Sequence, residues 1–592
     1  MRTMAVRRRL VALAFSAALL LGTGGPAAAV DVSFAGVGWG HGVGLSQYGS
    51  KAMGADGASY DQILHRYFTG VAIVPIATAV PDTFVTTDPT PFWVGLLQNS
   101  SVVSFTVESG QARLCFDPTD ACVRTAQLGE TFRFGPDGSG SCVFLHLAPT
   151  GESSVVGLPG SCDASVRPLS DQTILAVPYK ARSYRHGILR FRESPMTGNI
   201  HTVYEIGVDD YMRGLSEVPD SWSTAAIEAQ VVVSRSFAVW NALDRGGENT
   251  FSLDRRNDCA CNLRDDTSDQ VFRGWTGESS HPNWVSAVSS TAQKVMVSSG
   301  TVALGLYSSS SGGSTENYAD VFVGGIHPYL TTVFDSPAFA DSAANPHTSW
   351  GAGYNQGALA DAFGFSWVSN VEVVERNDSG SARTVRLVGV VDGQRAETTV
   401  TGVEMRTALS LRSTTFEIIV TPRFEDVPVD ALFAGEILGL HDLGITSGCS
   451  PGGFCPERTV TRAEMAAFLV RALGLSAAEG VNPFVDVDGH ALEAEISALQ
   501  ASGITGGCTP TRFCPERAVT RAEMAAFVVR GFGSASAEAT PFVDTDGHFF
   551  EAEISTLRAK GITGGCTPTQ FCPERAVTRA EMAAFLIRAL AS

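Results

Sequence analysis

The chain is poor in positive charge and in long apolar runs. Its 592 residues carry 42 Lys and Arg against 61 Asp and Glu, which gives a net charge of −19. This balance excludes a nucleic-acid binder that relies on bulk basic charge, and it excludes attraction to an anionic surface through overall charge. An anionic partner must therefore be held by a local site. After the first 29 residues no apolar run is long enough to cross a membrane, so we expect no span there.

Patterns for metals and nucleotides are also missing. The 12 Cys form no paired CxxC motif of the zinc type. The Gly-rich stretch at 36–49 lacks the Lys of a phosphate-binding loop and the strand–helix context of a dinucleotide fold. Two segments starting at Asp486 and Asp544 hint at calcium loops, but Ser497 and Ser555 stand where a Glu ligand is required. We therefore expect no metal and no other cofactor.

Residues 1–29 have the pattern of an export signal. Arg7, Arg8 and Arg9 precede an apolar run at 10–21, and small residues at 27–29 form a cleavage site. A membrane anchor is the alternative, but the run is short for a span. Loss of the four Arg in this leader would take the net charge from −19 to −23. We therefore expect a secreted protein.

Cysteine usage agrees with export, because all 12 Cys follow the leader and their number is even. Six of them form a repeated C-x5-C pattern, and we predict a local disulfide in each: Cys449/Cys455, Cys508/Cys514 and Cys566/Cys572. The pairing of the other six stays open. For Cys259 and Cys261 a disulfide is favoured over a metal, since no His lies beside them.

The C-terminal third is a threefold internal repeat, with Cys449, Cys508 and Cys566 at offsets of 59 and 58 residues. Each copy opens with Phe-x-Asp and continues with an amphipathic helix, Gly-Ile-Thr, the Cys loop and a helix that starts at Thr-Arg-Ala-Glu. We predict repeats at 423–475, 483–533 and 541–592.

The Thr-Arg-Ala-Glu motif is a capping box, which explains its Thr and its Glu. It does not explain Arg462, Arg521 and Arg579, which lie in the first helical turn beside free backbone N–H groups. Each is either a solvated side chain copied by duplication or part of an anion site.

The three units resemble S-layer homology domains through F-x-D, G-I-T and C-P-E-R-x-V-T-R-A-E-M-A-A-F. The resemblance implies an all-α module of three repeats that binds anionic, often pyruvylated, secondary cell-wall polysaccharide. It also implies that Arg462, Arg521 and Arg579 contact this ligand.

Residues 91–416 have the pattern of an α+β domain. Early stretches at 102–107, 173–177 and 200–206 predict strands, and 224–243 predicts a long helix capped by Ser223 or Thr224. Residues 71–90, rich in Pro, Thr and Asp, are typical of a linker, and a Gly-rich segment at 30–70 precedes them.

Three clusters in these regions are candidates for chemistry. Glu217 lies just before Pro219 and a helix start, where a surface Glu is also common. Small and hydroxylated residues at 308–316 form either a loop that approaches a sugar chain or a solvent loop. His41, flanked by Gly, is either catalytic or a packed structural side chain.

Together the clusters resemble the stage II sporulation protein D / LytB family. The matching stretches are G-x-G-x-G-H-G-V-G-L-S-Q-Y-G at 36–49, D-Y-M-R-G-L-S-E-V-P at 210–219, S-S-G-G-S-T-E at 310–316 and E-M-R-T-A-L-S-L-R-S-T-T-F at 404–416. In the family the G-H-G-V-G segment follows the last of these, whereas here it comes first, as in a circular permutation. The segment 30–70 can complete the domain if it folds back beside 404–416.

The resemblance implies a peptidoglycan lytic transglycosylase in which Glu217 is catalytic. One carboxyl group suffices, since it acts first as acid and then as base, and burial would raise its pKa. We expect the glycan strand to contact these residues: His41, Gln47, Arg235, Ser311, Gly312, Gly313 and Thr315.

Other members of the family enhance a wall amidase, so the alternatives are a non-catalytic amidase enhancer, a peptidoglycan-binding wall protein or a purely structural wall component. The expected partners are peptidoglycan strands, wall polysaccharide and a wall amidase.

Overall fold

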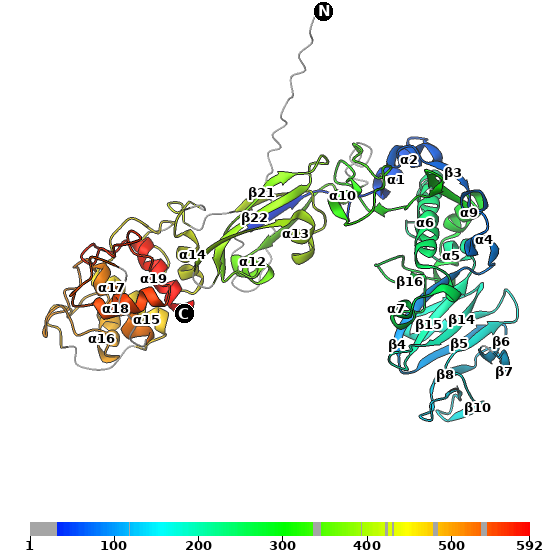
Figure 1. Ribbon diagram of the computed structural model, residues 1–592, viewed down its shortest axis with the longest axis horizontal. Coiled ribbons are helices and arrows are strands. Elements are labelled where there is room, and N and C mark those ends of the chain that lie inside the picture. The colour runs from blue at the N-terminus through cyan, green and yellow to red at the C-terminus, as the bar shows by residue number, and fades with distance from the viewer. Residues whose placement is uncertain are drawn as a thin grey trace, which may run out of the picture.

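The computed structural model describes residues 32–117, 119–335, 345–391, 394–420, 424–428, 431–450, 452–476, 483–533 and 542–591. The predicted export signal lies outside these ranges. Figure 1 shows a β-sandwich and a helical layer at one end, a small domain around β21 and β22 in the middle, and a cluster of short helices at the other end. Within the described ranges, no helix has the length and apolarity that crossing a membrane requires.

Two sheets, antiparallel except for the parallel pair β16–β4, form the sandwich. Their inner faces share a core of Phe side chains such as Phe134 and Phe191, whose ring centroids lie 4.5 Å apart. One sheet has the order β10-β9-β8-β5-β12-β13 and the other β16-β4-β15-β14-β11-β6-β7. Their strands are β4 (Phe92–Ser100), β5 (Val103–Ser109), β6 (Ala112–Phe116), β7 (Ala121–Ala126), β8 (Thr131–Pro136), β9 (Cys142–Leu147), β10 (Ser153–Gly160), β11 (Ala164–Pro168), β12 (Ile174–Val177), β13 (Arg182–Tyr184), β14 (Gly187–Glu193), β15 (Ile200–Ile206) and β16 (Leu263–Arg264).

The strands predicted at 102–107, 173–177 and 200–206 are confirmed as β5, β12 and β15. Sequence patterns did not predict that these strands belong to a two-sheet sandwich, since pairing between distant strands leaves no local signature.

The prediction of a linker at 71–90 is wrong. This stretch forms β3 (Ala72–Pro75), α3 (Ile76–Ala79) and α4 (Phe84–Thr87). Ile76 and Val85 are buried in the main core, and β3 pairs with β17 (Lys294–Ser298). Apolar anchors at two positions outweigh the turn-forming composition around them.

A helical layer packs beside the sandwich, centred on α6 (Thr224–Arg245). The Oγ of Ser223 accepts a hydrogen bond from the backbone N–H of Ala226, so the predicted cap is confirmed. The other elements of the layer are β2 (Leu45–Ser46), α1 (Gln47–Ala55), α2 (Tyr60–Tyr67), α5 (Val208–Arg213), α7 (Leu253–Asp258), α8 (Trp275–Glu278), α9 (Pro282–Ser290), β18 (Thr301–Val302), β19 (Tyr307–Ser308) and α10 (Tyr318–Val321).

The middle domain has a separate core and is completed by the start of the described chain. β1 (Val32–Gly36) lies between β20 (Trp350–Tyr354) and β24 (Phe416–Val420), antiparallel to both. The remaining elements are α12 (Gln356–Phe363), β21 (Trp367–Arg376), β22 (Ala382–Val391), β23 (Gln394–Thr401) and α13 (Gly402–Ala408). Residues 32–36 therefore fold back beside 416–420, and the region predicted as one domain contains more than one hydrophobic core.

The C-terminal module contains α14 (Ala434–Asp442), α15 (Arg462–Leu473), α16 (Glu493–Ala501), α17 (Arg521–Phe532), α18 (Glu551–Ala559) and α19 (Arg579–Ala591). Helix α16 packs on α15, α18 packs on α17, and α14 closes the ring by packing on α19. At the centre three backbone hydrogen bonds form a closed triangle, from Val460 to Val577, from Val577 to Val519 and from Val519 to Val460.

Isolated β-bridges, such as Thr461 with Ala518, also join the repeats, so the module is not purely helical. The three predicted C-x5-C disulfides are confirmed, and Cys259 pairs with Cys261. The other pairs, which the sequence left open, are Cys115–Cys122 and Cys142–Cys162.

Candidate functional site

Three segments that are distant in sequence meet around Glu217. β2 pairs in parallel with β19, which brings Leu45 opposite Tyr307. The Nε2 of Gln47 donates to the backbone carbonyl of Glu217 over 3.4 Å. The Gly-rich segment, the Glu217 loop and the Ser-rich segment thus form a single site, although more than 250 residues separate the first from the last.

Glu217 is half-buried in a loop that the backbone holds firmly. The N–H of Arg273 donates to the carbonyl of Gly214 over 2.7 Å, and Ser216 adopts a left-handed conformation with φ of 51°. Burial raises the pKa of Glu217 to about 7, while a hydrogen bond from Tyr307 and the charge of Arg273 act to lower it. The carboxyl group can therefore exchange a proton near neutral pH.

Tyr307 connects Glu217 to a buried polar network. The Nε2 of Gln270 donates to the hydroxyl of Tyr307 over 3.2 Å, and the hydroxyl of Tyr211 donates to the Oε1 of Gln270 over 3.2 Å. Because Gln270 accepts one hydrogen bond and donates another, its amide fixes the direction of the chain. The Tyr307 hydroxyl is left to donate to Glu217, which favours the ionised carboxylate.

His41 lies behind Tyr307 and holds its backbone. The N–H of Val43 donates to the Nδ1 of His41 over 3.0 Å, and the other ring nitrogen bonds the carbonyl of Tyr307. Burial and the charge of Arg406 lower the pKa of His41 to about 4, so the imidazole is neutral. Its two hydrogen bonds go to the backbone, which assigns His41 to positioning rather than to substrate contact.

Arg235, predicted to bind substrate, is fully buried. Its Nε donates to the Oδ1 of Asp209 over 2.9 Å, and its Nη1 donates to the carbonyls of Thr291 and Lys294 over 2.8 and 3.2 Å. The prediction of a substrate contact is wrong, because every direction of the guanidinium fork is occupied by the α6–α9 packing.

The predicted sugar-facing loop is also turned toward protein. Ser311 donates to the buried carboxylate of Asp335 over 2.6 Å, and Thr315 donates to the carbonyl of Thr331 over 2.9 Å. A Cβ on Gly312 would lie 3.0 Å from the carbonyl oxygen of Val37. These residues, with Gly313 at φ of 112°, support the Gly-rich segment. Ser311 and Thr315 are buried, whereas Gly312 and Gly313 are half-buried, and the predicted substrate contacts stay a prediction.

The sequence analysis missed Tyr307, Gln270 and Arg273. Tyr307 directly precedes the Ser-rich segment, but an aromatic residue next to a strand is more often a core side chain. Only the pairing of β2 with β19 places its hydroxyl beside Glu217.

The repeat arginines join neighbouring repeats. Arg462, Arg521 and Arg579 are only 3%, 3% and 2% exposed. The Nε of each donates to a Phe carbonyl of the next repeat: Arg462 to Phe513 over 2.8 Å, Arg521 to Phe571 over 2.7 Å and Arg579 to Phe454 over 2.7 Å. Because Arg579 of the last repeat reaches the first, these bonds close a ring.

Each guanidinium also lies over the Phe ring of the next repeat, at 4.7 to 4.9 Å from the ring centroid. Arg462 and Arg521 donate further to Glu523 and Glu581 over 3.2 and 3.0 Å. The three arginines therefore join neighbouring repeats, and their predicted contact with wall polysaccharide stays a prediction. The capping boxes themselves are confirmed.

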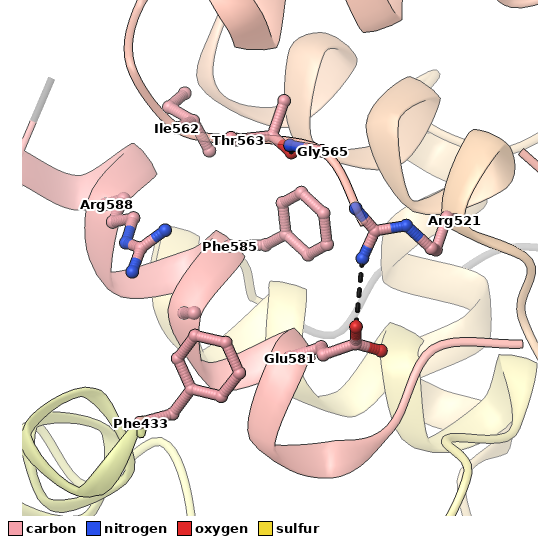
Figure 2. A pocket seen from close by; sticks show the side chains of 10 residues that line it. Phe433, Arg521, Ile562, Thr563, Gly565, Glu581, Phe585 and Arg588 are labelled. Atoms are coloured by element: carbon pink, nitrogen blue, oxygen red, sulfur yellow. Dashed lines mark hydrogen bonds and ion pairs between the residues drawn. The ribbon is translucent and has the colours of Figure 1, made fainter. Parts of the chain in front are cut away.

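Two pockets lie at junctions between repeats. One, of about 60 Å³, is lined by Arg521, Glu581, Phe585 and Arg588, with Phe433 of the first repeat on one side and the backbone at Thr563 and Gly565 on the other (Figure 2). The second, of about 440 Å³, is lined by Phe433, Ile437, Glu457, Arg575 and Thr578 among others. Both combine aromatic or aliphatic surface with charged groups.

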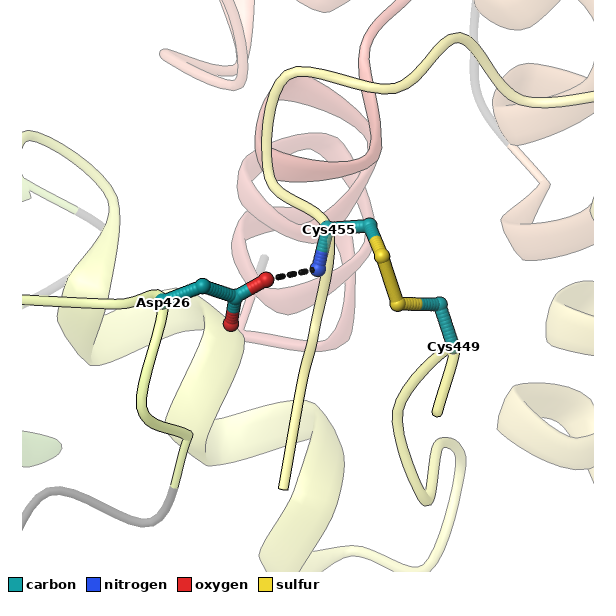
Figure 3. A group of neighbouring side chains, drawn as sticks. All are labelled: Asp426, Cys449 and Cys455. Carbon is teal, nitrogen blue, oxygen red and sulfur yellow. Dashed lines mark hydrogen bonds between the residues drawn. A yellow bond between two sulfur atoms is a disulfide. The ribbon is translucent and has the colours of Figure 1, made fainter. Parts of the chain in front are cut away.

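The Asp of each Phe-x-Asp motif caps the Cys loop. Figure 3 shows Asp426 beside Cys455, which is bonded to Cys449. The two carboxylate oxygens of Asp426 accept hydrogen bonds from the N–H groups of Phe454 and Cys455 over 2.7 and 2.6 Å. Although these three residues cluster as metal ligands would, the sulfurs are joined in a disulfide and offer no thiolate.

Comparison with known families divides the chain into two matched regions. Residues 196–297 match the model of the stage II sporulation protein family. Residues 423–466, 483–525 and 541–583 match the S-layer homology domain. The chain therefore carries one SpoIID domain followed by three S-layer homology domains. Glu217 and Gln270 lie inside the first match, whereas His41, Gln47 and Tyr307 lie outside it.

Curated relatives are similar over limited lengths. An S-layer protein of Bacillus thuringiensis subsp. finitimus is 29% identical over 171 residues, which is 28% of this chain and 21% of that protein. A cellulosome-anchoring protein of Acetivibrio thermocellus is 32% identical over 152 residues, which is 24% of this chain and 34% of that protein. The chain thus spans about a fifth to a third of these relatives.

Proposed function

We propose that this protein is a peptidoglycan lytic transglycosylase attached to the cell wall, with Glu217 as its single acid–base group. The observation that carries the proposal is a half-buried carboxyl group with a pKa of about 7, built by three motif segments that converge on it. The SpoIID domain supports the choice of a wall glycan as substrate.

The site accounts for both proton transfers. In its acid form Glu217 donates a proton to the glycosidic oxygen while the bond from C1 to that oxygen breaks. The resulting carboxylate then takes the proton of the C6 hydroxyl of the same sugar, whose oxygen bonds to C1 and forms a 1,6-anhydro end. No water is consumed and Glu217 regains its proton. Tyr307, which donates to the carboxylate, would steady the ionised form between the two steps.

We propose further that the repeats hold the protein to an anionic wall polysaccharide. The three S-layer homology domains support this role, as does similarity to an S-layer protein and a cellulosome-anchoring protein. The pockets between repeats combine arginines with aromatic or aliphatic walls, which suits an acidic sugar. These features favour a location at the cell surface.

The test is mass spectrometry of purified glycan strands after incubation with wild-type protein and with Glu217→Gln. We expect 1,6-anhydro ends with the wild type and none with the variant. An inactive wild type that stimulates a wall amidase would instead support the non-catalytic enhancer.

A further inference from the structure

Trp39 is an exposed aromatic ring on a tightly fixed backbone. Its side chain is 44% exposed. Its N–H donates to the carbonyl of Ser310 over 2.9 Å, and the N–H of Ser310 donates back over 3.2 Å. The N–H groups of Gly38 and Gly40 donate to the carbonyls of His347 and Arg412 over 2.8 and 2.9 Å. Three separate chain segments therefore hold Trp39, although its ring gains little from burial.

The glycines on both sides of Trp39 are required by this arrangement. Gly38 and Gly40 have φ of 85° and 110°, a region that favours glycine. A Cβ on Gly38 would lie 2.8 Å from the N of Gly312, and one on Gly40 would lie 2.7 Å from the Cβ of Ser308. The Gly-rich segment thus presses against the Ser-rich segment and leaves the indole outside.

Trp39 begins a row of four rings that leads to the Glu217 loop. The ring centroids of Trp39 and His347 are 4.9 Å apart, those of His347 and Tyr48 are 5.3 Å apart, and those of Tyr48 and Trp222 are 5.4 Å apart. We call these four residues the aromatic row.

Two hydrogen bonds connect the aromatic row to the loop that carries Glu217. Tyr48 follows Gln47, which donates to the Glu217 carbonyl. The N–H of Trp222 donates to the carbonyl of Pro219 over 3.1 Å, in the turn that follows Glu217. The aromatic row therefore adjoins the loop that carries Glu217.

Cations flank the aromatic row at both ends. The guanidinium of Arg412 lies 4.8 Å from the centroid of Trp39. The ammonium of Lys51 lies 5.4 Å from the centroid of Tyr48 and 5.7 Å from that of Trp222. In a chain with a net charge of −19, a local cation such as Arg412 beside Trp39 is what an acidic ligand would need.

We propose that the aromatic row is the track on which a carboxylate-bearing glycan strand stacks, so that Trp39 binds a sugar unit distant from the bond being cleaved. The inference rests on the proposed function. The flat C–H faces of pyranose rings fit aromatic rings, and the Arg412 guanidinium beside Trp39 suits a carboxylate on the strand. A fixed backbone that presents an exposed ring is preorganised, so binding costs little ordering.

The experiment compares Trp39→Ala, Trp39→Phe and Tyr179→Ala, using glycan strands separated by length. Tyr179 is the matched control, because it is an aromatic residue that is 86% exposed and lies in the turn between β12 and β13, outside the segments that form the row. We expect Trp39→Ala to raise KM for long strands about tenfold with kcat unchanged. Trp39→Phe should restore most of the affinity, and for the shortest strands that are still cleaved the KM should not change. An unchanged KM for long strands would overturn the inference.

Binding in the Glu217→Gln background separates this inference from the proposed function. If the wild type does not cleave but Trp39→Ala still weakens strand binding about tenfold, the track stands and the transglycosylase proposal fails. If the wild type cleaves and Trp39→Ala binds long strands as well as the Tyr179→Ala control, the track is overturned. Loss of amidase binding with unchanged glycan binding would also overturn it, since the row would then be a protein-docking surface.

Discussion

Glu217 and the repeat arginines are both charged motif residues near helix starts, yet the molecule surrounds their charges differently. Around Glu217, which is half-buried, burial raises the pKa of the carboxyl group to about 7. Each repeat arginine is buried against a Phe ring and bonded to the carbonyl of the next repeat. A motif carboxyl group that can exchange a proton near neutral pH indicates chemistry, whereas a motif guanidinium whose Nε bonds the neighbouring repeat indicates assembly.

The two regions also differ in how they are built. The Glu217 site needs segments from distant parts of the chain, while each Arg contact repeats between consecutive units and then closes the ring. The first site should therefore fail when a remote segment is removed, and the second should fail at the junctions between repeats.

The largest effect should follow deletion of residues 30–70. This deletion removes the central strand β1 of the middle domain and helices α1 and α2, which pack on α6. We expect the region from 91 to 416 to lose cooperative folding, measured by thermal denaturation. Removal of residues 1–29 alone is the control. A melting temperature unchanged by the longer deletion would contradict the difference drawn between the two regions, because the Glu217 site would then not depend on remote segments.

Glu217→Gln should reduce glycan cleavage by about a thousandfold without lowering stability. The folded-state pKa of about 7 lies above the ordinary pKa of 4.5 for a Glu, so the stability this group contributes is present at low pH and is lost as pH rises through 7. A neutral Gln should therefore be at least as stable as the wild type at pH 8. Thermal melts and cleavage assays of both proteins check this, and a strongly destabilised variant would contradict it.

Arg521→Ala should destabilise the repeat module by about 3 kcal/mol, because it removes a buried charged partner of Phe571 and Glu581. Arg512→Ala, at an exposed position in the same module, is the matched control and should change stability by less than about 0.5 kcal/mol. Urea unfolding measures both.

Replacement of Arg462, Arg521 and Arg579 together should release the protein from the wall by unfolding the module. The capping boxes stay intact in this variant, but each stabilises only its own helix start. They cannot replace the hydrogen bonds that the arginines make between repeats. If the triple variant is released while its melting temperature is unchanged, these arginines act mainly on the ligand.

The smallest effect is expected from Tyr307→Phe. The Tyr307 hydroxyl lowers the pKa of Glu217, so its loss should raise that pKa further. The loss of kcat at high pH, where the acid form disappears, should then move to higher pH. A pH–rate profile of the variant beside wild type measures the shift, and a shift toward lower pH would contradict the assigned hydrogen bond.

Local patterns predicted the elements well but not their partners. The strand at 200–206 and the capped helix that begins at Thr224 carry their own periodicity and cap. Arg235 was wrongly predicted as a substrate contact, because its partners Asp209 and Thr291 are distant in sequence. No local pattern around Arg235 indicates that it binds them.

Glu217 itself was predicted through its family motif, and burial supplies the high pKa that its chemistry needs. The hydroxyl of Tyr307 was missed, since only the pairing of two short strands places it at the carboxylate. The junction role of the repeat arginines was missed because the closed ring appears only when three copies fold together.

Cleavage of purified strands in ¹⁸O-labelled water tests the central claim most directly. If Glu217 directs the C6 hydroxyl of the sugar to C1, the new ends are 1,6-anhydro sugars that contain no ¹⁸O, and the Glu217→Gln protein produces none. Reducing ends that carry ¹⁸O, or unchanged cleavage by the variant, would contradict the account.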